Sequence, residues 1–344
     1  MLILSNLKSY LHRSTRPLFL GLGNFDGVHL GHQSLLQYVA EKAHAEKGTA
    51  AVLTFREHPQ RILHPKHKPA LLMSSDYKMF LLKEYGIDLC FWLHFTKKFS
   101  EQTARSFIKE ILVKQLQVRE VCLGYNAHFG HGRLGNVELM RRLASQMGFL
   151  FEEIKPVMAD GGFVSSSRIR KLVREARLEE AASLLGRPFG IWAKVVKGTG
   201  RGRSLGFPTA NLRITSDALP PHGVYPVMLR ILELERVASG NDASSEELKV
   251  KKRGPWLQGA LNYGHRPSFE KRKRSVTGVV EVFILDFKGE LYGKGLEVCF
   301  YPKLRSEKKF EDVASLKRQI REDVDTTRHY FAGTPKKSFT KVVG

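Results

Sequence analysis

Residues 23–36, GNFDGVHLGHQSLL, join a strand to a helix and carry two histidines between glycines. They follow the apolar run at residues 17–23, which predicts a buried strand, and they lead into a helical pattern over residues 32–48. Glycines at such a turn let a ligand approach the backbone, and a helix N-terminus offers free N–H groups to an anion. The turn therefore predicts a phosphate site, with His29 and His32 on one side of the first helical turn.

Strands and helices alternate through the rest of the first half. Further strands are predicted at residues 49–55, 88–95, 120–125 and 150–158, and helices at residues 75–86, 100–116, 136–148, 166–177 and 178–186. The strands are nearly continuous apolar runs, which is typical of a parallel sheet covered on both faces. We therefore predict an α/β domain with a Rossmann-like parallel sheet, whose ligands bind beyond the carboxyl ends of the strands.

The pattern changes after the GRPFG stretch at residues 186–190, where we place a domain boundary. Strand-like runs at residues 190–198, 223–234, 255–264, 277–287 and 290–301 predict a small antiparallel β-barrel or sandwich. A helix over residues 306–330 is expected to close it, with its apolar residues on one face: Phe310, Val313, Leu316, Ile320 and Val324. Residues 237–254 are expected to form a long solvated hairpin loop. The predicted division is thus 1–186, 187–330 and a mobile basic tail, 331–344.

Composition narrows the class of protein. The chain has 344 residues, 42% of them hydrophobic and 26% charged, which is typical of a globular protein. It has no apolar run near the roughly 20 residues that cross a membrane and no signal-peptide pattern, so we expect a cytoplasmic protein without membrane attachment. Cys90, Cys122 and Cys299 have neither metal-site nor disulfide spacing, and we expect buried thiols.

The net charge of +22 suits anionic partners such as nucleotides and flavin phosphates. Part of that charge lies in basic runs at residues 249–253 and 271–274 and near the C-terminus. Such runs usually form solvated loops, and no aromatic-rich RNA-binding signature accompanies them. We therefore expect no specific nucleic-acid partner.

The two histidines allow three interpretations. Beside a nucleotide triphosphate, two imidazoles can donate hydrogen bonds to the charge that grows on the attacked phosphate, and such stabilisation carries most of phosphoryl transfer. Alternatively, His29 and His32 are ordinary helix-cap residues. A zinc site is a further alternative, although no third ligand is evident.

The turn closely resembles the HxGH signature of the nucleotidyltransferase superfamily, and GNFDGVHLGH is most similar to the adenylyltransferase half of the prokaryotic bifunctional riboflavin kinase/FAD synthetases. TFREHP at residues 54–59, GYNAHFGHGRLGN at residues 124–136 and SSSRIR at residues 165–170 resemble further motifs of that family. Glu57 replaces a proline of the family pattern, Ala127 an aromatic residue, and Ser167 a threonine.

This resemblance implies site residues for FMN adenylylation. The catalytic residues would be His29 and His32, and His58 and Asn126 would contact the flavin. The nucleotide would bind at two segments, the turn and the start of the helix at residue 166: Gly23, Phe25, Asp26, Gly31, Ser166, Ser167 and Arg170. The serines can cap a helix and offer hydroxyls to phosphate, and an arginine can bind phosphate with two hydrogen bonds.

A second candidate site lies in KGTGRGRSLGFPTANL, residues 197–212. Its glycine spacing is not that of a Walker A loop. Thr209 and Asn211 are two residues apart in an extended segment, so they project to the same side, and both offer oxygen to Mg²⁺. Glu281 lies on a strand face that is otherwise apolar, where partial desolvation would favour a general base. The alternative is that Glu281 faces solvent from an edge strand.

Residues 200–212, 260–269, 280–287 and 291–310 resemble the riboflavin kinase module of the same family. The resemblance implies a six-stranded antiparallel barrel, Thr209 and Asn211 as ligands of Mg-ATP, Glu281 as the base for the ribityl 5′-hydroxyl, and Arg305 near the flavin. A loop would cover ATP: Gly198, Gly200, Arg201 and Gly202. The family's Asn-x-Gly-x-x-Pro-Thr-Phe pattern corresponds to residues 262–269, with Ser268 for threonine.

The predicted function is an enzyme that makes FMN from riboflavin and ATP, and FAD from FMN and ATP, with riboflavin, FMN, ATP and Mg²⁺ as ligands. One alternative is adenylyl transfer to another acceptor, such as nicotinamide mononucleotide. Another is a basic nucleic-acid-binding protein without catalysis. An oligomer is possible, and the sequence leaves its size open.

Overall fold

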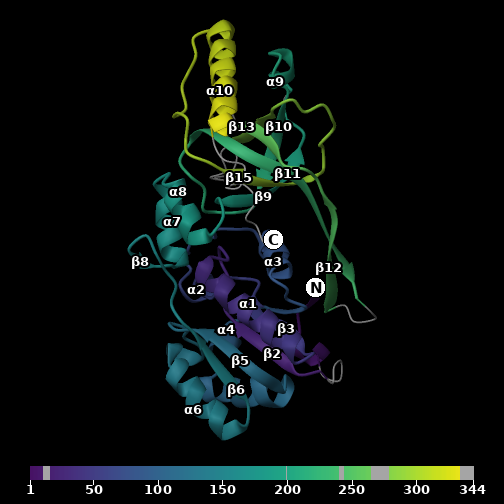
Figure 1. The fold of residues 1–344 in the computed structure, drawn as a ribbon, viewed down its shortest axis with the longest axis vertical. Coiled ribbons are helices and arrows are strands. Elements are labelled where there is room, and N and C mark those ends of the chain that lie inside the picture. The colour runs from purple at the N-terminus through teal and green to yellow at the C-terminus, as the bar shows by residue number, and fades with distance from the viewer. Residues whose placement is uncertain (11–15, 199, 240–243, 265–278, 334–344) are drawn as a thin grey trace. The chain divides into compact units, whose positions relative to one another are not determined.

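The computed structural model describes residues 1–10, 16–198, 200–239, 244–264 and 279–333. Its contacts form two compact units. Unit 1 comprises residues 1–70, 78–166 and 235–249, and unit 2 comprises residues 71–77, 167–234 and 250–344. The boundary at residue 186 stays a prediction. The order of the elements along the chain can be followed in Figure 1.

Unit 1 contains a mostly parallel sheet in the order β12-β1-β4-β3-β2-β5-β6. All neighbours are parallel except β12 and β1. β3 and β5 flank β2 on opposite sides, so the strand order reverses beside β2, where open α/β sheets bind ligands. The bounds are β1 Leu2–Leu4, β2 Leu18–Leu22, β3 Thr49–Phe55, β4 Leu89–Leu93, β5 Val118–Gly124 and β6 Leu150–Ile154. The predicted parallel sheet is thus confirmed, and β1 is a strand that the sequence analysis did not identify.

Helices follow most strands of unit 1, and α1 (Leu30–Ala45) packs against β2, β3 and β5. The predicted helix over residues 100–116 is instead a short α5 (Ala104–Ser106) that continues as a π-helix over Phe107–Gln115. The Leu116 N–H, for example, donates to the Ile111 carbonyl at 2.9 Å. Other elements are η1 Leu7–Tyr10, α2 Pro59–Leu63, α3 Ser75–Glu84, α4 Lys97–Ser100, η3 His131–Arg133, α6 Val137–Met147, β7 Met158–Ala159 and β8 Gly162–Phe163.

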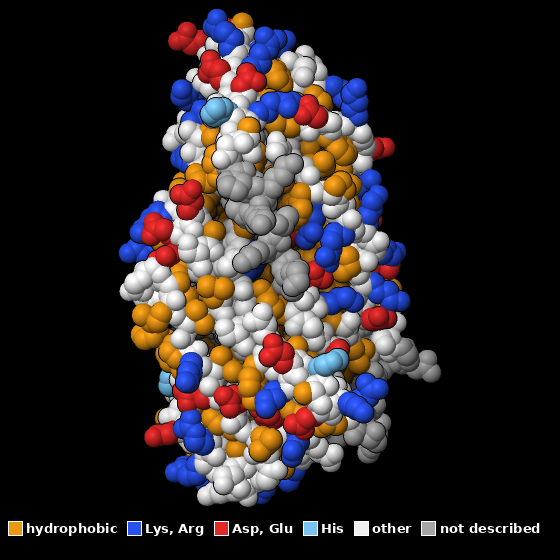
Figure 2. Space-filling view, viewed as in Figure 1, with side chains coloured by type: hydrophobic (Ala, Val, Ile, Leu, Met, Phe, Trp, Pro, Cys, Tyr) orange, Lys and Arg blue, Asp and Glu red, His pale blue; other side chains and the backbone are white. Residues whose placement is uncertain are grey.

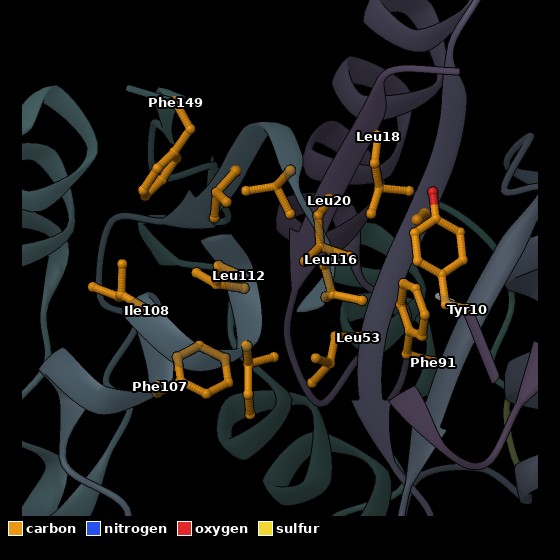
Figure 3. Close-up of a cluster of buried hydrophobic side chains, with 14 of the residues drawn as sticks. Tyr10, Leu18, Leu20, Leu53, Phe91, Phe107, Ile108, Leu112, Leu116 and Phe149 are labelled. Carbon is orange, nitrogen blue, oxygen red and sulfur yellow. The ribbon is translucent and has the colours of Figure 1, made fainter. Parts of the chain in front are cut away.

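Buried side chains from the sheet and the π-helix form the core of unit 1. Figure 3 shows Leu18, Leu20 and Leu53 from β2 and β3. In the same figure, Phe107, Ile108 and Leu112 extend the cluster from the π-helix. Tyr10 packs edge-on against Phe91 of β4 with ring centroids 5.3 Å apart. This core fixes the carboxyl ends of β2, β3 and β4, from which the candidate site is built.

Unit 2 contains a closed antiparallel barrel of six strands. Its order is β11-β13-β14-β10-β9-β15, and β15 pairs again with β11. The bounds are β9 Gly190–Val196, β10 Thr209–Ile214, β11 Gly223–Ala238, β13 Leu257–Gly264, β14 Val279–Ile284 and β15 Gly295–Phe300. The helices are α7 Ser166–Arg174, α8 Leu178–Leu185, α9 Arg201–Ser204 and α10 Val313–Gly333. The predicted barrel is confirmed.

Two predictions about the second half are wrong. Residues 237–254 are not a solvated loop, because β12 (Ser245–Arg253) pairs with β1 and Leu248 is fully buried; residues 240–243 lie outside the described part. The closing helix begins at Val313 rather than residue 306, and Val313 is 58% exposed. Its buried positions are Asp323, Val324, Thr327 and Phe331. The apolar spacing predicted the C-terminal part of that face, whereas the Asp312 carboxylate, which accepts from the Ser315 N–H, marks the true start.

The predicted basic tail is described only at its first residues. Residues 331–333 belong to α10. Residues 334–344, and positions 265–269 of the Asn-x-Gly-x-x-Pro-Thr-Phe pattern, lie outside the described residues.

Candidate active sites

The HxGH turn, residues 23–32, has an unusual backbone. Phe25, Gly27 and Val28 have φ angles of 52°, 87° and 40°. The left-handed region costs roughly 1–2 kcal/mol for a residue with a Cβ atom. Phe25 and Val28 are fully buried, so packing holds them in this conformation. Strain that packing maintains in this way is typical of binding and catalytic sites.

His29 and His32 lie side by side, as their spacing predicted. Their ring centroids are 3.7 Å apart with an interplanar angle of 15°, and the Phe25 ring lies 5.3 Å from that of His32. His29 is the N-cap of α1, where its Nδ1 accepts from the His32 N–H at 3.3 Å. A neutral His29 therefore carries its proton on Nε2, which is a donor. His29 is therefore a helix-cap residue, as one of the interpretations expected, and the cap is formed by its Nδ1 atom.

The other residues predicted to bind the nucleotide belong to this turn or to α7. Ser166 Oγ donates to the Asp26 carbonyl at 2.8 Å, which ties the start of α7 to the turn. Asp26 is 6% exposed. Ser167 and Arg170 follow three residues apart on α7, so they share a side of that helix.

Two glycines of the turn lie against aromatic rings. A Cβ atom on Gly23 would come within 3.1 Å of the Phe25 ring, and one on Gly31 within 3.4 Å of the His29 ring. Gly23 is therefore the tighter of the two positions.

Lys78 of α3 is a buried cation beside the HxGH turn that the sequence analysis did not identify. Its ammonium donates to the Asn24 carbonyl at 3.3 Å, to Thr54 Oγ1 at 3.4 Å and to the Phe55 carbonyl at 3.2 Å. It thereby joins the HxGH turn to the end of β3. Burial lowers the pKa of this amine from its usual value. No sequence signal distinguished this lysine, because the same helix also carries Asp76, Lys83 and Glu84.

The two predicted flavin residues of unit 1 lie at strand ends. His58 caps α2, and its Nδ1 accepts from the Gln60 N–H at 3.2 Å. Asn126 lies in an exposed turn just after β5. An open pocket of about 310 Å³ lies beside this turn and is lined by Tyr125, Ala127, His128, Asn136, Val137, Glu138, Arg141 and Glu153. Ala127, which stands where the family pattern has an aromatic residue, lines this pocket and also packs against the core of unit 1.

In the barrel, strand register brings three polar residues into one row. Glu281 of β14 lies opposite Asn211 of β10 and opposite Asn262 of β13. Residues opposite one another across a ladder share a face of the sheet, and Thr209 shares it because it is two positions from Asn211. β14 is paired on both sides, so the alternative that placed Glu281 on an edge strand is wrong. Asn262 joins the row only through this register.

The glycines of the predicted ATP loop lie against the predicted metal ligands. A Cβ atom on Gly198 would come within 2.0 Å of the Asn211 amide nitrogen, and one on Gly202 within 2.8 Å of Thr209 Oγ1. Gly200 has a φ of 74°, which favours glycine. Arg201 begins α9, and Thr199 lies outside the described residues.

Arg305 has a structural contact of its own. Its guanidinium donates to both carboxylate oxygens of Asp323 on α10, with Nε–Oδ1 and Nη2–Oδ2 distances of 2.7 and 2.6 Å. The Arg305 carbonyl accepts from the Val224 N–H of β11 at 2.9 Å. Arg305 thus ties α10 to the barrel, while its contact with the flavin stays a prediction.

Comparisons with known proteins match two family profiles to successive parts of the chain. The FAD synthetase family profile matches residues 11–168, and the riboflavin kinase profile matches residues 185–331. The bifunctional riboflavin kinase/FMN adenylyltransferase of Haemophilus influenzae is 34% identical over 93% of this chain and 97% of its own length. The Escherichia coli K12 protein of the same name is 33% identical over 92% and 93%.

A crystal structure from Streptococcus pneumoniae, titled a macrolide-efflux protein, superposes with a TM-score of 0.75 and 26% identity. It covers 95% of this chain and 98% of its own. Within the described residues, every helix is too short or too polar to cross a membrane. From the two profile matches and from relatives that align over almost the whole length, the chain belongs to the family of bifunctional riboflavin kinases/FMN adenylyltransferases.

Proposed function

We propose that this chain phosphorylates riboflavin at the barrel and adenylylates the resulting FMN at the HxGH turn. The main support for the proposal is that each of the two profile matches contains its own group of polar side chains. They are the stacked His29–His32 pair and the Asn211–Glu281–Asn262 row.

At the barrel, Glu281 accepts the proton of the ribityl 5′-hydroxyl. The hydroxyl oxygen forms a bond to the γ-phosphorus of ATP, the bond from that phosphorus to the bridging oxygen breaks, and ADP leaves with the electron pair. Thr209 and Asn211 would hold Mg²⁺ through two oxygens on one face, and the lack of a Cβ atom at Gly198 and Gly202 lets the loop approach both side chains closely. When bound, Mg²⁺ would neutralise phosphate charge.

At the HxGH turn, a phosphate oxygen of FMN attacks the α-phosphorus of a second ATP. A bond forms between these atoms, the bond to the β-phosphate oxygen breaks, and pyrophosphate leaves with FAD as the other product. The Nε2–H of His29, together with the His32 ring, stabilises the charge that develops on the phosphate oxygens. No covalent intermediate on the protein is needed.

The test is incubation with riboflavin, ATP and Mg²⁺, followed by chromatography of the flavins. We expect FMN to form first and FAD to follow, with one pyrophosphate released per FAD. Product analysis with nicotinamide mononucleotide in place of FMN tests the alternative acceptor. FMN without any FAD, together with an adenylylated nicotinamide product, would contradict the proposal.

We also propose that the protein is cytoplasmic and that its charge serves anionic small molecules. Cys90, Cys122 and Cys299 are buried as free thiols, which is usual in a reducing compartment. On the face drawn in Figure 2, Lys and Arg side chains are interspersed with Asp and Glu. Strong, salt-sensitive RNA binding without ATP turnover would instead favour the nucleic-acid alternative.

A further inference from the structure

We infer that Arg236 is a positioning residue for FMN in the adenylylation reaction, although it lies within the riboflavin kinase profile match. The inference rests on the proposed function. It concerns the arm, which we define as residues 235–249, the part of the β11–β12 segment that belongs to unit 1. Figure 1 labels β12.

The arm is anchored on unit 1 by its backbone. Leu2, Ile3 and Leu4 of β1 pair with residues 245–247 of β12. The Leu248 N–H donates to the Met1 carbonyl at 3.0 Å, and the Leu248 carbonyl accepts from Lys83 Nζ at 3.1 Å. The Leu248 side chain is fully buried. The described part of β12 is therefore held by the sheet of unit 1, which limits where the side chains of the arm reach.

Arg236 reaches a tryptophan at the carboxyl end of β4. Its Cζ lies 4.3 Å from the centroid of the Trp92 ring, and the Cζ of Arg56 lies 4.5 Å from the centroid of the same ring. Trp92 is 7% exposed. Each guanidinium is thus close enough to the ring for a cation–π contact, and that contact gains strength away from water.

Arg56 begins the segment that bears the predicted flavin residue His58. The Arg56 N–H donates to the Leu93 carbonyl at 2.9 Å. The next residue, Glu57, contacts His94 with an Oε1–Nδ1 distance of 3.1 Å. Both contacts join the segment before His58 to the end of β4, on which Trp92 lies. Through the Trp92 ring, Arg236 supports the end of β4 and therefore the segment that bears His58. A small displacement of His58 would weaken FMN binding, because a binding group acts only from the correct position.

This arrangement predicts a specific kinetic effect. Arg236→Met removes the cation but keeps a long side chain, so the 56–58 segment loses one support while Thr209, Asn211 and Glu281 are unchanged. We expect the KM for FMN and the Kd for FMN to rise by about three- to tenfold, with kcat and riboflavin phosphorylation little changed. Arg236→Lys, which keeps the charge, should restore part of the loss. Lys252→Met, at an exposed position on β12, is the matched control and should behave as wild type.

The experiment measures both reactions and the Kd for FMN alone. Arg56→Met removes the second cation at the same ring and should change the same constants, so the inference does not depend on one variant folding well. An unchanged Kd and KM for FMN in both variants would overturn the inference. Equal losses of both activities would also overturn it, because they would indicate a general structural defect. If the wild type binds FMN but makes no FAD, the proposed function fails while the Kd comparison still decides the role of Arg236.

Discussion

The HxGH turn and the row around Glu281 differ in how their polar groups are held. In the turn, Asp26 and His29 are buried and lie within a segment of ten consecutive residues, 23–32. In the barrel, Glu281 and Asn211 are half-buried and Asn262 is exposed, and these three residues come from three strands. The first group of residues is a product of local chain conformation, whereas the second exists only when β10, β14 and β13 pair.

This difference predicts that the two groups of residues can be disabled separately. A local turn can lose its chemistry without disturbing the barrel, and a carboxylate in the barrel can be neutralised without disturbing the turn. The variants below test that independence, and each is compared in both reactions.

The largest effect is expected for the double variant His29→Asn, His32→Ala. Asparagine retains an acceptor for the helix cap, so the variant removes both imidazoles while α1 keeps its start. One lost hydrogen-bond donor to a developing charge costs about 10²–10³-fold, so loss of both imidazoles should slow FAD formation from FMN by roughly 10⁴–10⁶-fold. Riboflavin phosphorylation should persist. Flavin chromatography with each substrate measures both rates, and a parallel loss of both would contradict the two-site division.

Glu281→Gln is expected to impair riboflavin phosphorylation and to leave FAD formation intact. Loss of the base should slow riboflavin phosphorylation by about 10²–10⁴-fold, while the conversion of FMN into FAD continues. The control is Glu290→Gln, which changes an exposed carboxylate of the same unit. Steady-state rates measured with riboflavin and with FMN show which of the two reactions each variant slows. Retention of full kinase activity in Glu281→Gln would remove Glu281 from the mechanism.

A smaller effect, on stability, is expected for Lys78→Met. Because burial lowers the pKa of Lys78 in the folded protein, the unfolded chain binds more protons between that lowered pKa and the usual 10.5. The free energy of unfolding of the wild type should therefore rise, relative to that of Lys78→Met, as the pH increases through this window. Denaturant titrations at a series of alkaline pH values measure the difference.

Lys98→Met, at an exposed position, provides the reference for the Lys78 experiment. If the wild type and Lys78→Met show parallel pH profiles, the Lys78 amine does not carry a perturbed charge. FAD formation by Lys78→Met is also expected to fall, because Asn24 of the HxGH turn loses a donor.

Much of the fold followed from periodicity. The apolar strands of the first half predicted the parallel sheet, since a strand buried on both faces needs no polar alternation. The spacing of His29 and His32 predicted their proximity, because it depends only on the geometry of one helical turn. The π-helix over Phe107–Gln115 could not be predicted, since its apolar pattern resembles that of an α-helix and its extra residue per turn depends on packing.

The candidate sites were predictable to different degrees, because a sequence pattern identifies groups of neighbouring residues but not contacts between distant ones. The residues of the HxGH turn are contiguous, so a motif identifies them. Lys78 was missed because its partners, the Asn24 and Phe55 carbonyls and Thr54, are distant in sequence and mostly backbone atoms. The Arg305–Asp323 ion pair was missed likewise, since nothing in the spacing of two charged residues shows that a helix will fold back onto the barrel.

The sequence by itself determined the alternation of elements, the two profile matches and the local HxGH turn, because these depend on short-range periodicity and side-chain chemistry. Tertiary structure alone decided which unit each segment joins. Residues 71–77 lie within the FAD synthetase match but belong to unit 2, where the Tyr77 hydroxyl donates to Glu297 at 2.7 Å. Residues 235–249 lie within the riboflavin kinase match but complete the sheet of unit 1. The physical reason is that strand pairing and burial are satisfied by whichever partner the folded chain brings near, at any separation in sequence.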